Sequence, residues 1–338
     1  GLRTPHTTTN VVNFECMLNF STSHILDLSN LGIESIKFDA HLSALSSNDL
    51  TIRTIIKMKN FGSIIFYGIE KFKSIELRSN NLTGFEYENR IDKSDLNLIF
   101  NTNINDHLVL ENNKISILKN TTLTALHIFD KINHLYLINN LIEIIEDNSF
   151  IGLTNLNIID LRNNKLEFIT NNAFKGLTNL GRLLLTDNQI KWIHLDAFVD
   201  LINLNTLNFD RNNLQIFDIF TIGKNLNLFE LFLNFNHLDF FESKSFPFEN
   251  HYLGFLRFSF NNLKNITNKM FKNFRYVNQM ALDSNQISFI EDFSFIDCKN
   301  LRLLDLDNNQ LQNITSNYFR GLDELKLSLI HISQGIVR

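Results

Sequence analysis

"NNAFKGLTNLGRLLLTDNQIKWI", running from Asn171 to Ile193, places a single asparagine, Asn188, among closely spaced leucines and isoleucines. The stretch before it, "DNSFIGLTNLNIIDLRNNKLEFI" from Asp147 to Ile169, has almost the same layout. Self-similarity at a fixed period is the sequence signature of repeat architectures. The two stretches therefore predict a repeat protein and define a template, L-x-x-L-x-L-x-x-N-x-L-x-x-I.

The template recurs along most of the chain, mainly at steps of 24 residues. Its asparagine falls at Asn80, Asn113, Asn140, Asn164, Asn188, Asn212, Asn236, Asn261, Asn285 and Asn309. Ten residues later the chain has Phe150, Phe174, Phe198, Ile222, Phe246, Phe271, Phe295 and Phe319. One coil cannot bury its apolar face alone, so we expect stacked coils to form a continuous core.

Within one coil, Leu183 and Leu185 are two residues apart, as inward-facing positions on a short strand must be. Where the chain leaves that strand, its buried backbone groups need new hydrogen-bond partners. An asparagine amide offers two donors and an acceptor, so Asn188 can satisfy them. We therefore predict a structural role for the asparagine column.

This pattern resembles the leucine-rich repeat, in the 24-residue form common in extracellular proteins. The resemblance implies an α/β repeat, a solenoid of about 12 coils with a curved parallel β-sheet on the concave face and an irregular or short-helical convex face. Together with Cys16 before the array and an irregular second coil, it is similar to insect-type members, namely Toll ectodomains and secreted leucine-rich immune proteins of mosquitoes. In that family the asparagine column is a structural ladder.

We expect three regions: an N-terminal flank and partial cap at 1–24, one solenoid domain at 25–326, and an irregular tail at 327–338. A degenerate coil lies between Asp39 and Lys71, and the sequence does not fix its register. The tail breaks the template at Ser328 and Ser333, and its run "LSLIHIS" resembles translated linker DNA from sequencing libraries. We interpret the tail as non-native sequence and the chain as a fragment, the alternative being an irregular last coil.

The two cysteines lie about eleven coils apart, a separation on the order of 50 Å at the usual strand spacing. A disulfide needs Cα atoms within about 7 Å, so Cys16 and Cys298 cannot pair in an open solenoid. Cys298 occupies an apolar column and is predicted to be a buried free thiol. The family resemblance implies a disulfide for Cys16 with a partner outside this segment, and a link between two chains is the alternative.

Composition and motifs argue against several functions. The chain has 338 residues, 20% of them charged, and a net charge of −5, which gives no basic footprint for nucleic acid. No apolar run has the length of a membrane span. No G-x-S-x-G, H-E-x-x-H, C-x-x-C or G-x-G-x-x-G motif occurs. We therefore predict no enzyme, no catalytic residue, no cofactor and no metal.

His107 and His134 occupy the same strand position of consecutive coils, with Glu111 nearby. Two histidines and a carboxylate can hold zinc, but adjacent solvated histidines or a pH-sensitive pair are the preferred interpretations. Five N-x-S/T sequons predict glycosylation at Asn19, Asn81, Asn120, Asn265 and Asn313. Four of them fall outside the predicted strands, so glycans there leave the concave sheet open.

The variable strand positions should carry the function, because they project from a rigid sheet. They form a charged group and an aromatic group: Asp160, Arg162, Arg182, Asp187, Asp210 and Arg211, then Phe232, Phe235, Phe255, Arg257 and Phe260. Exposed aromatic and arginine side chains are typical interface anchors. The alternative is that these phenylalanines pack sideways on one another.

We expect a non-enzymatic recognition module that binds a protein or a microbial surface ligand on the concave face. The setting implied is extracellular, in innate immunity or as a receptor ectodomain, with a dimer as one arrangement. An extracellular matrix or adhesion protein is the first alternative. An intracellular repeat scaffold is the second, and it would explain the small number of cysteines.

Overall fold

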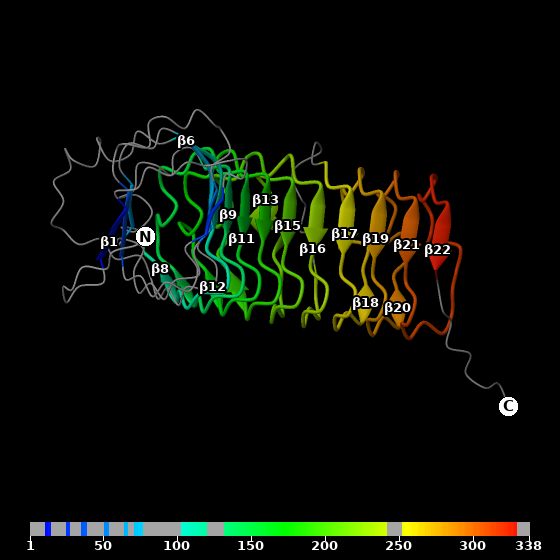
Figure 1. The fold of residues 1–338 in the computed structure, drawn as a ribbon. Coiled ribbons are helices and arrows are strands. Elements are labelled where there is room, and N and C mark those ends of the chain that lie inside the picture. Colours follow the sequence, from blue (N-terminus) through cyan, green and yellow to red (C-terminus); the bar gives the residue numbers. More distant parts are fainter. Residues whose placement is uncertain are drawn as a thin grey trace. The chain divides into compact units, whose positions relative to one another are not determined.

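The computed structural model describes residues 103–119, 132–241 and 252–329, and before residue 103 it describes strands alone. The chain divides into two compact units, Gly1–Asp160 and Leu161–Arg338. Both units are built from short parallel strands (Figure 1). No helix in the described residues is long and apolar enough to cross a membrane.

Unit 1 contains two sheets and a strand pair. The smaller sheet has the order β1 (Val11–Phe14), β3 (Ser35–Phe38) and β5 (Ile64–Phe66). The larger one runs β2 (Ile25–Asp27), β4 (Thr51–Arg53), β6 (Lys71–Glu76), β7 (Asn103–Val109), β9 (His134–Tyr136) and β11 (Ile158–Asp160). The pair is β8 (Ile117–Leu118) with β10 (Ile144–Ile145). The degenerate coil thus has a register, because Ile52 on β4 lies opposite Leu26 and Ile75.

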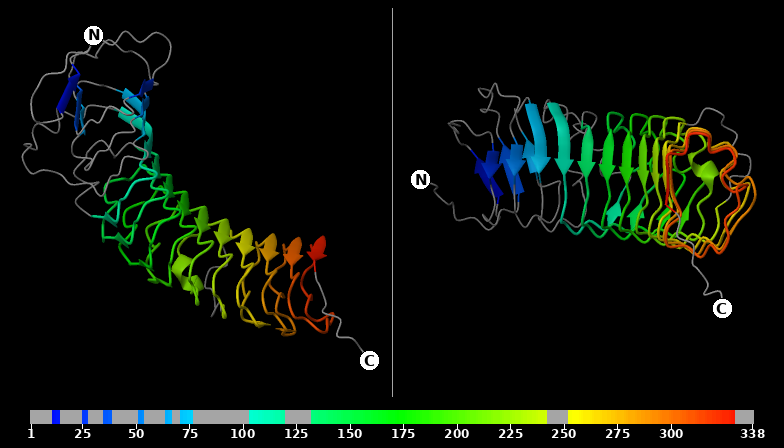
Figure 2. Two further views of the ribbon diagram at one scale, coloured as in Figure 1. Left: turned by 60° about the horizontal axis from the view of Figure 1, so that its bottom comes forward. Right: turned by 90° about the vertical axis from the view of Figure 1, so that its right-hand side faces the viewer.

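Unit 2 carries one parallel sheet with a strand from each coil (Figure 2). Its order is β13 (Arg182–Leu184), β15 (Thr206–Asn208), β16 (Glu230–Phe232), β17 (Phe255–Arg257), β19 (Gln279–Ala281), β21 (Leu303–Asp305) and β22 (Leu327–Leu329). The central residues of neighbouring strands face each other, as Leu207 and Leu231 do. Because the register never slips, each sequence column becomes a row of side chains along the sheet.

The opposite side of unit 2 consists of turns and two-residue strands. There β12 (Phe168–Ile169) pairs with β14 (Trp192–Ile193), and β18 (Asn265–Ile266) pairs with β20 (Phe289–Ile290). The 3-10 helix η4 (Ile219–Ile222) is the helical element of the described residues. The predicted parallel repeat solenoid is confirmed, although it is almost without helix. The described coils make about eight turns rather than twelve.

The asparagine ladder has the predicted position and bonding. Asn188 is buried, and its amide nitrogen donates to Leu161 O at 3.0 Å and to Leu185 O at 3.1 Å. Asn212 repeats this one coil later, donating to Leu185 O at 2.9 Å and Phe209 O at 3.0 Å. All nine described ladder positions, Asn113 to Asn309, are buried. Asn80 lies outside the described residues.

A second asparagine row, which the sequence reasoning missed, lies on the turn side. The side-chain amides of Asn203, Asn227 and Asn300 donate to backbone oxygens of the preceding coil at 2.9, 3.0 and 2.9 Å. Its sequence signal is the recurring Asn-Leu pair, as in "LINL" at Asn203, "NLNL" at Asn227 and "CKNL" at Asn300. Stacked coils are therefore held by side-chain amides on two sides of the core.

The core is formed by the predicted leucine and phenylalanine columns. Phe150, Phe174, Phe198, Phe271 and Phe295 are fully or almost fully buried, whereas Phe319 is half-buried. Neighbouring rings of the column contact each other, with Phe271 and Phe295 stacked at 5.5 Å between centroids. Cys298 is a buried free thiol, as predicted. Phe246 and Cys16 lie outside the described residues.

The expectation of an irregular tail from residue 327 is wrong for its first three residues. Leu327–Leu329 form β22, which pairs with β21 so that Ser328 lies opposite Leu304. The cause is backbone pairing, since the carbonyl of Leu329 accepts from the N–H of Leu306 at 2.8 Å whatever the side chains are. The serine is nevertheless a poor fit, because its buried hydroxyl oxygen has no hydrogen-bond partner.

An outward row of large apolar side chains accompanies the two-residue strands. The fourth residue after each ladder asparagine of unit 2 is about half exposed at Phe168, Trp192, Ile216, Phe240 and Phe289. The same position holds the sequon residues Asn265 and Asn313. We call this row the turn-side row, and it lies away from the strands of the sheet.

Candidate functional site

The residue before each ladder asparagine has a left-handed backbone. Its φ lies between 51° and 57° at Asn112, Asn139, Asn163, Asp187, Arg211, Phe235, Phe260, Ser284 and Asn308. Asparagine and aspartate tolerate this conformation, but a bulky side chain there is a genuine outlier. Phe235 and Phe260 are therefore, together with Arg211, the bulky exceptions in this row.

The left-handed turn at these phenylalanines is held by the next coil. The N–H of Phe235 donates to Ser259 O at 2.9 Å, and the N–H of Phe260 donates to Asp283 O at 3.1 Å. Relaxing either backbone would break a bond that seven of the nine members of the row make. Strained residues of this kind cluster at functional sites, which makes these two rings candidates for binding.

The two rings form an exposed stack. Their centroids are 4.2 Å apart with 9° between the planes, and 40% of Phe235 and 48% of Phe260 remain exposed. The guanidinium of Arg211 lies 4.5 Å from the centroid of Phe235 and 3.9 Å from a carboxylate oxygen of Asp187. Four consecutive coils therefore contribute a carboxylate, a guanidinium and two rings in a row.

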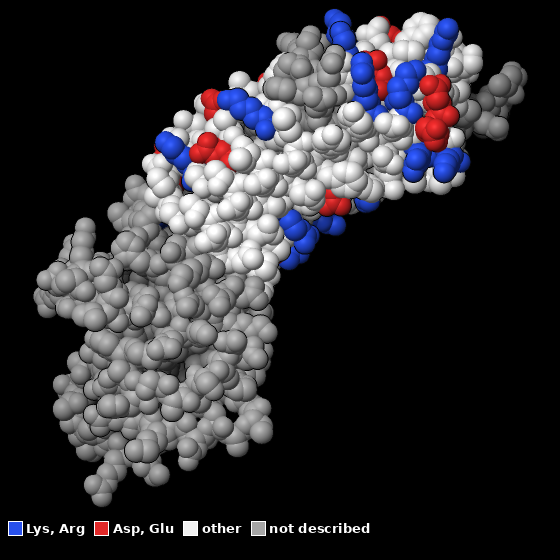
Figure 3. Space-filling view, turned by 90° about the horizontal axis from the view of Figure 1, so that it is seen from above, with Lys and Arg blue, Asp and Glu red and all other residues white. Residues whose placement is uncertain are grey.

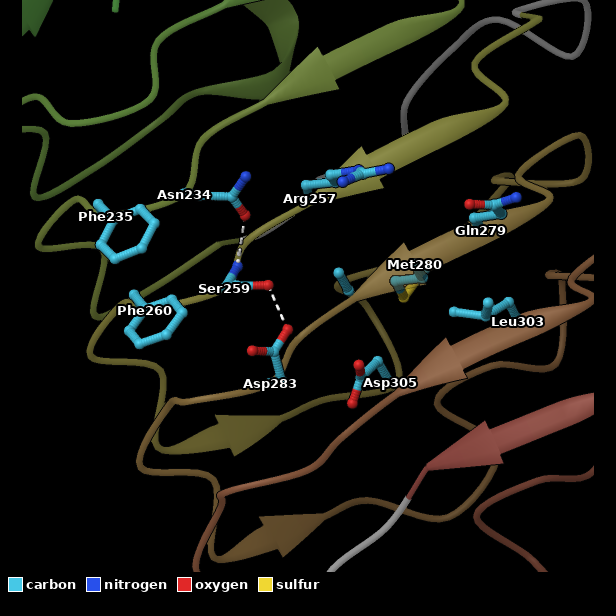
Figure 4. Close-up of a pocket in the computed structure, with 11 residues that line it drawn as sticks. Asn234, Phe235, Arg257, Ser259, Phe260, Gln279, Met280, Asp283, Leu303 and Asp305 are labelled. Atoms are coloured by element: carbon cyan, nitrogen blue, oxygen red, sulfur yellow. Dashed lines mark hydrogen bonds between the residues drawn. The ribbon is translucent and has the colours of Figure 1, made fainter. Parts of the chain in front are cut away.

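A hollow of about 370 Å³ opens beside this stack on the exposed surface of the unit 2 sheet, which we call the sheet face. Figure 4 shows the two rings at one end, with Asp283 and Asp305 next to them and Gln279 and Leu303 further along. It is lined by Asn234, Phe235, Arg257, Ser259, Phe260, Gln279, Met280, Ala281, Asp283, Leu303 and Asp305. Concave surfaces with apolar walls and a few polar groups are typical of binding sites.

Hydrogen bonds between coils fix the polar wall. The hydroxyl of Ser259 donates to Asp283, and the N–H of Ser259 donates to the side-chain oxygen of Asn234 at 2.9 Å (Figure 4). Asp305 accepts from the N–H of Asp307 at 3.0 Å. Burial raises the pKa of the Asp305 carboxyl; the hydrogen bond from Asp307 opposes this effect, and the negative charges of Asp283 and Asp307 add to it.

Asp210 lies further along the sheet face and links two coils. Its carboxylate accepts from the N–H of Asn234 at 2.7 Å. Burial raises the pKa of the Asp210 carboxyl, an effect opposed by the hydrogen bonds of Asn234 and by the positive charges of Arg257 and Arg211. Asp210 therefore positions the backbone beneath the aromatic group rather than standing free on the surface.

The candidate binding residues predicted from the sequence differ in their exposure. Phe232 and Phe255 are half-buried; the guanidinium of Arg257 lies 5.4 Å from the ring centroid of Phe232, and Phe255 contacts Phe229 edge to face at 5.0 Å. Arg162 and Arg182 are exposed. Asp160 was expected on the exposed face, and this is wrong because it is only 1% exposed. It also belongs to unit 1, whereas the other ten residues belong to unit 2.

The predicted sideways packing of phenylalanines occurs at Phe235 and Phe260, yet it leaves both rings exposed. The two interpretations offered by the sequence, interface anchors and sideways packing, are thus compatible. What the sequence reasoning missed is the strain and the acidic wall formed by Asp283 and Asp305. The signal for the strain is that most coils have asparagine or aspartate just before the ladder asparagine, whereas these two have phenylalanine.

His107 and His134 are neighbours, as predicted. Their ring centroids are 4.4 Å apart, and Tyr136 lies 5.8 Å from His107 and 6.2 Å from His134. Among the described residues, no group of three or more histidine, cysteine, aspartate or glutamate side chains is arranged to hold a metal ion. Stacking on Tyr136 describes this pair better than ligation does.

Two of the five sequons lie in described segments, Asn265 on β18 and Asn313 after the last ladder position, and both are exposed. Asn19, Asn81 and Asn120 lie outside the described residues. Figure 3 shows one side of the described surface, where charged side chains of both signs occur in small groups separated by uncharged surface. Glycans at Asn265 and Asn313 would lie in the turn-side row and leave the sheet face open.

Comparison with known proteins supports the repeat assignment. Residues 130–190, 251–311 and 275–331 match the sequence profile of the family described as Leucine rich repeat. A search of curated protein sequences finds no significant match. The fold is a leucine-rich repeat solenoid, and the matched segments carry the repeats that the sequence predicts.

Solved structures with this fold include chains from several complexes. A chain of the TLR13–ssRNA13 complex has a TM-score of 0.66 and 23% identity over 88% of this chain and 42% of that one. A chain of the octameric complex of Latrophilin 3, Unc5D and FLRT2 has a TM-score of 0.64 and 23% identity, covering 79% and 77%. A chain of the Drosophila Toll–Spatzle complex has a TM-score of 0.58 and 19% identity, covering 85% and 41%. The chain thus spans less than half of the TLR13 and Toll chains it resembles.

Proposed function

We propose that the chain is a protein-recognition module that binds its partner through the sheet face of unit 2. The observation that carries this proposal is the exposed stack of Phe235 and Phe260 on left-handed backbones. Each ring occupies a position at which asparagine would be less strained, so backbone conformation argues against a purely structural role for it. Aromatic and arginine side chains are the usual anchors of protein interfaces, and Arg211 and Arg257 flank the stack.

A protein fits this surface better than a nucleic acid does. The hollow beside the rings has the carboxylates of Asp283 and Asp305 in its wall, which would repel phosphates. The net charge of −5 points the same way. Among the structural neighbours, Toll is recorded with Spatzle and FLRT2 with Unc5D and Latrophilin 3, whereas TLR13 is recorded with RNA.

We further propose an extracellular setting, as a receptor ectodomain or a secreted immune protein of the insect type. The exposed sequons at Asn265 and Asn313 support this, because glycans there are compatible with partner binding. Expression through a secretory pathway, followed by enzymatic deglycosylation, should shift the electrophoretic mobility of the parent. The Asn265→Gln/Asn313→Gln variant should show a smaller shift, because it lacks the glycans of these two sites. A shift as large as that of the parent would show that these two sites carry no glycan.

The binding proposal is tested with a display library of protein fragments from the source organism, panned on the full chain. Recovered binders are measured on the parent and on the variant Phe235→Asn/Phe260→Asn. We expect affinity to fall by about tenfold or more, since each hot-spot ring is worth about 2 kcal/mol. The matched control, Phe168→Asn/Phe289→Asn, removes two rings of the turn-side row that are at least as exposed. Binders whose affinity is changed by neither double variant would show that the binding site lies elsewhere.

A further inference from the structure

We propose that the hollow beside Phe260 receives an arginine side chain of the protein partner. Its guanidinium would stack on the uncovered face of the Phe260 ring and pair with the carboxylates of Asp283 and Asp305. This inference rests on the proposed sheet-face recognition and specifies the chemistry of the residue that the partner must present.

The described part of the chain already contains this arrangement at Arg211. At the other end of the aromatic stack, Arg211 places its guanidinium 4.5 Å from the centroid of Phe235 and 3.9 Å from a carboxylate oxygen of Asp187. A cation over an aromatic face is attracted by the ring quadrupole, and a carboxylate alongside adds an ion pair. Arg211 therefore shows that this row accommodates a guanidinium between a ring and a carboxylate.

The stack has no such cover at its second end. Coils stack in the order Arg211, Phe235, Phe260 and Ser284 at this position of the repeat. Serine is too small to cover a phenyl ring, and Phe260 remains more exposed than Phe235. The ring lines the hollow together with the acidic residues of the next two coils (Figure 4). A planar group from outside can therefore take the place that Arg211 has at the first end.

The charges around this place favour a cation. Asp283 and Asp305 come from adjacent coils, and the negative charges of Asp283 and Asp307 add to the effect of burial in raising the pKa of the Asp305 carboxyl. Of the residues that line the hollow, Arg257 is the basic one, and its guanidinium is directed to the ring of Phe232. Asp283 accepts hydrogen bonds from the hydroxyls of Ser259 and Ser284, so the charge of the acidic wall is met by neutral donors and can still attract a cation supplied by the partner.

Arginine suits this place better than lysine does. A guanidinium is planar, stacks flat on an aromatic ring and offers paired donors to carboxylates, whereas an ammonium is a compact and strongly hydrated point charge. A hollow of about 370 Å³ holds such a side chain together with part of its backbone. The partner segment should therefore present arginine at its centre, with other contacts reaching Gln279 and Leu303.

The experiment uses a phage-displayed library of random peptides, panned on the full chain and counter-selected on Phe235→Asn/Phe260→Asn. Enriched peptides are synthesised with each arginine replaced in turn by citrulline, a neutral residue of the same shape. We expect one citrulline replacement to weaken binding by about tenfold or more, as expected for a lost charged hydrogen bond. Asp283→Asn/Asp305→Asn should weaken the arginine peptide similarly and leave the citrulline peptide unchanged. Asp239→Asn, which removes an exposed carboxylate elsewhere in unit 2, should change neither.

The outcomes separate this inference from the function on which it rests. Peptides that depend on Phe260 but tolerate citrulline, or that bind equally well through lysine, overturn the arginine assignment and leave sheet-face recognition standing. Recovery of no peptide that depends on the two rings overturns both. Equal losses on Asp239→Asn and on Asp283→Asn/Asp305→Asn would show a general charge effect and overturn the placement of arginine in this hollow.

Discussion

The side-chain oxygen of Asn188 accepts a hydrogen bond from the backbone N–H of Leu166, one coil away, at 3.1 Å. The amide nitrogen of the same asparagine donates back to Leu161 O, again in the earlier coil, and to Leu185 O in its own. With a longer bond to Thr186 O at 3.4 Å, a single buried amide therefore contacts four backbone groups of two coils. The loss of such a group leaves several polar atoms unpaired at once.

Asn188→Ala should lower the free energy of unfolding by about 1–3 kcal/mol, the usual cost of unpaired buried polar groups. Urea titration followed by circular dichroism measures this. The control, Asn171→Ala, removes an exposed asparagine of the same coil and should change stability by less than about 0.5 kcal/mol. Equal stability of the two variants would mean that water replaces the ladder amide at this coil.

Phe235→Asn/Phe260→Asn should be at least as stable as the parent although it loses the aromatic stack. A left-handed backbone costs roughly 1–2 kcal/mol at a non-glycine residue and less at asparagine, whereas one aromatic pair contributes about 0.5–1.5 kcal/mol. Thermal melts should show an unchanged or raised Tm. Phe235→Ala/Phe260→Ala, which loses the rings but not the strain, should melt below the asparagine variant. The reverse order would show that backbone strain is not the deciding term.

Gly254→Ala should destabilise unit 2 because a Cβ there would overlap the ring of Phe229. Gly254 lies directly before β17, and its N–H donates to Phe229 O at 2.9 Å, so the backbone cannot move away freely. We expect a loss of about 1–3 kcal/mol, typical of overpacking. Adding Phe229→Ala to this variant should make room and recover part of the loss. A double variant that melts no higher than Gly254→Ala would rule out the ring as the cause.

Asp305→Asn should raise the Tm at neutral pH. Burial raises the pKa of this carboxyl, so its ionised form is less favourable in the folded than in the unfolded chain, and the folded state gains stability as pH falls through the raised pKa. Asparagine removes the penalty and can still accept from Asp307. Below the ordinary pKa of 3.8 both states are protonated and the difference should vanish. Asp323→Asn, at an exposed carboxylate paired with Lys299, is the control and should not raise the Tm. If Asp305→Asn raised the Tm by the same amount at neutral pH and below pH 3.8, the electrostatic cause would be contradicted.

Ser328→Leu should stabilise the last described coil. The position faces Leu304, and the serine hydroxyl is buried there without a hydrogen-bond partner. Replacing it with the leucine of the other coils removes an unpaired polar group and adds apolar contact, for a gain of about 1 kcal/mol. Hydrogen exchange at the N–H of Leu306, which donates to Leu329 O, should slow. Unchanged exchange would mean that the strand pairs no better with leucine.

The sequence predicted the parts of this fold that depend on periodicity. Leu231, Leu233, Leu256 and Phe258 are buried where the template puts them, because a stacked coil leaves few alternatives for an apolar column. It predicted strand pairing poorly at the chain end, since backbone hydrogen bonds form at Ser328 in spite of its side chain. Asp160 was misplaced because strand alternation puts it on the outward face, whereas it is only 1% exposed in the structure.

The candidate site was predicted in composition but not in geometry. Phe235 and Phe260 could be named from their column, yet the left-handed backbone and the 4.2 Å stack depend on how adjacent coils bond to each other. Asp283 and Asp305 were missed because they lie on the next coils, and only the structure shows that they line the same hollow as the rings. A hollow formed by four coils has no signature within any single repeat.

The row before the ladder asparagines has a consequence for how such a surface can change over generations. Its backbone is fixed by bonds between coils and not by its own side chains, so the side chain there is exchangeable without loss of the scaffold. Substitution toward asparagine is favourable for folding at every coil, which means that unused rings should drift away. On the proposed function, phenylalanine at these two adjacent coils is expected to be kept only while a ligand selects for it, and its replacement by asparagine in a descendant lineage would mark the loss of that ligand.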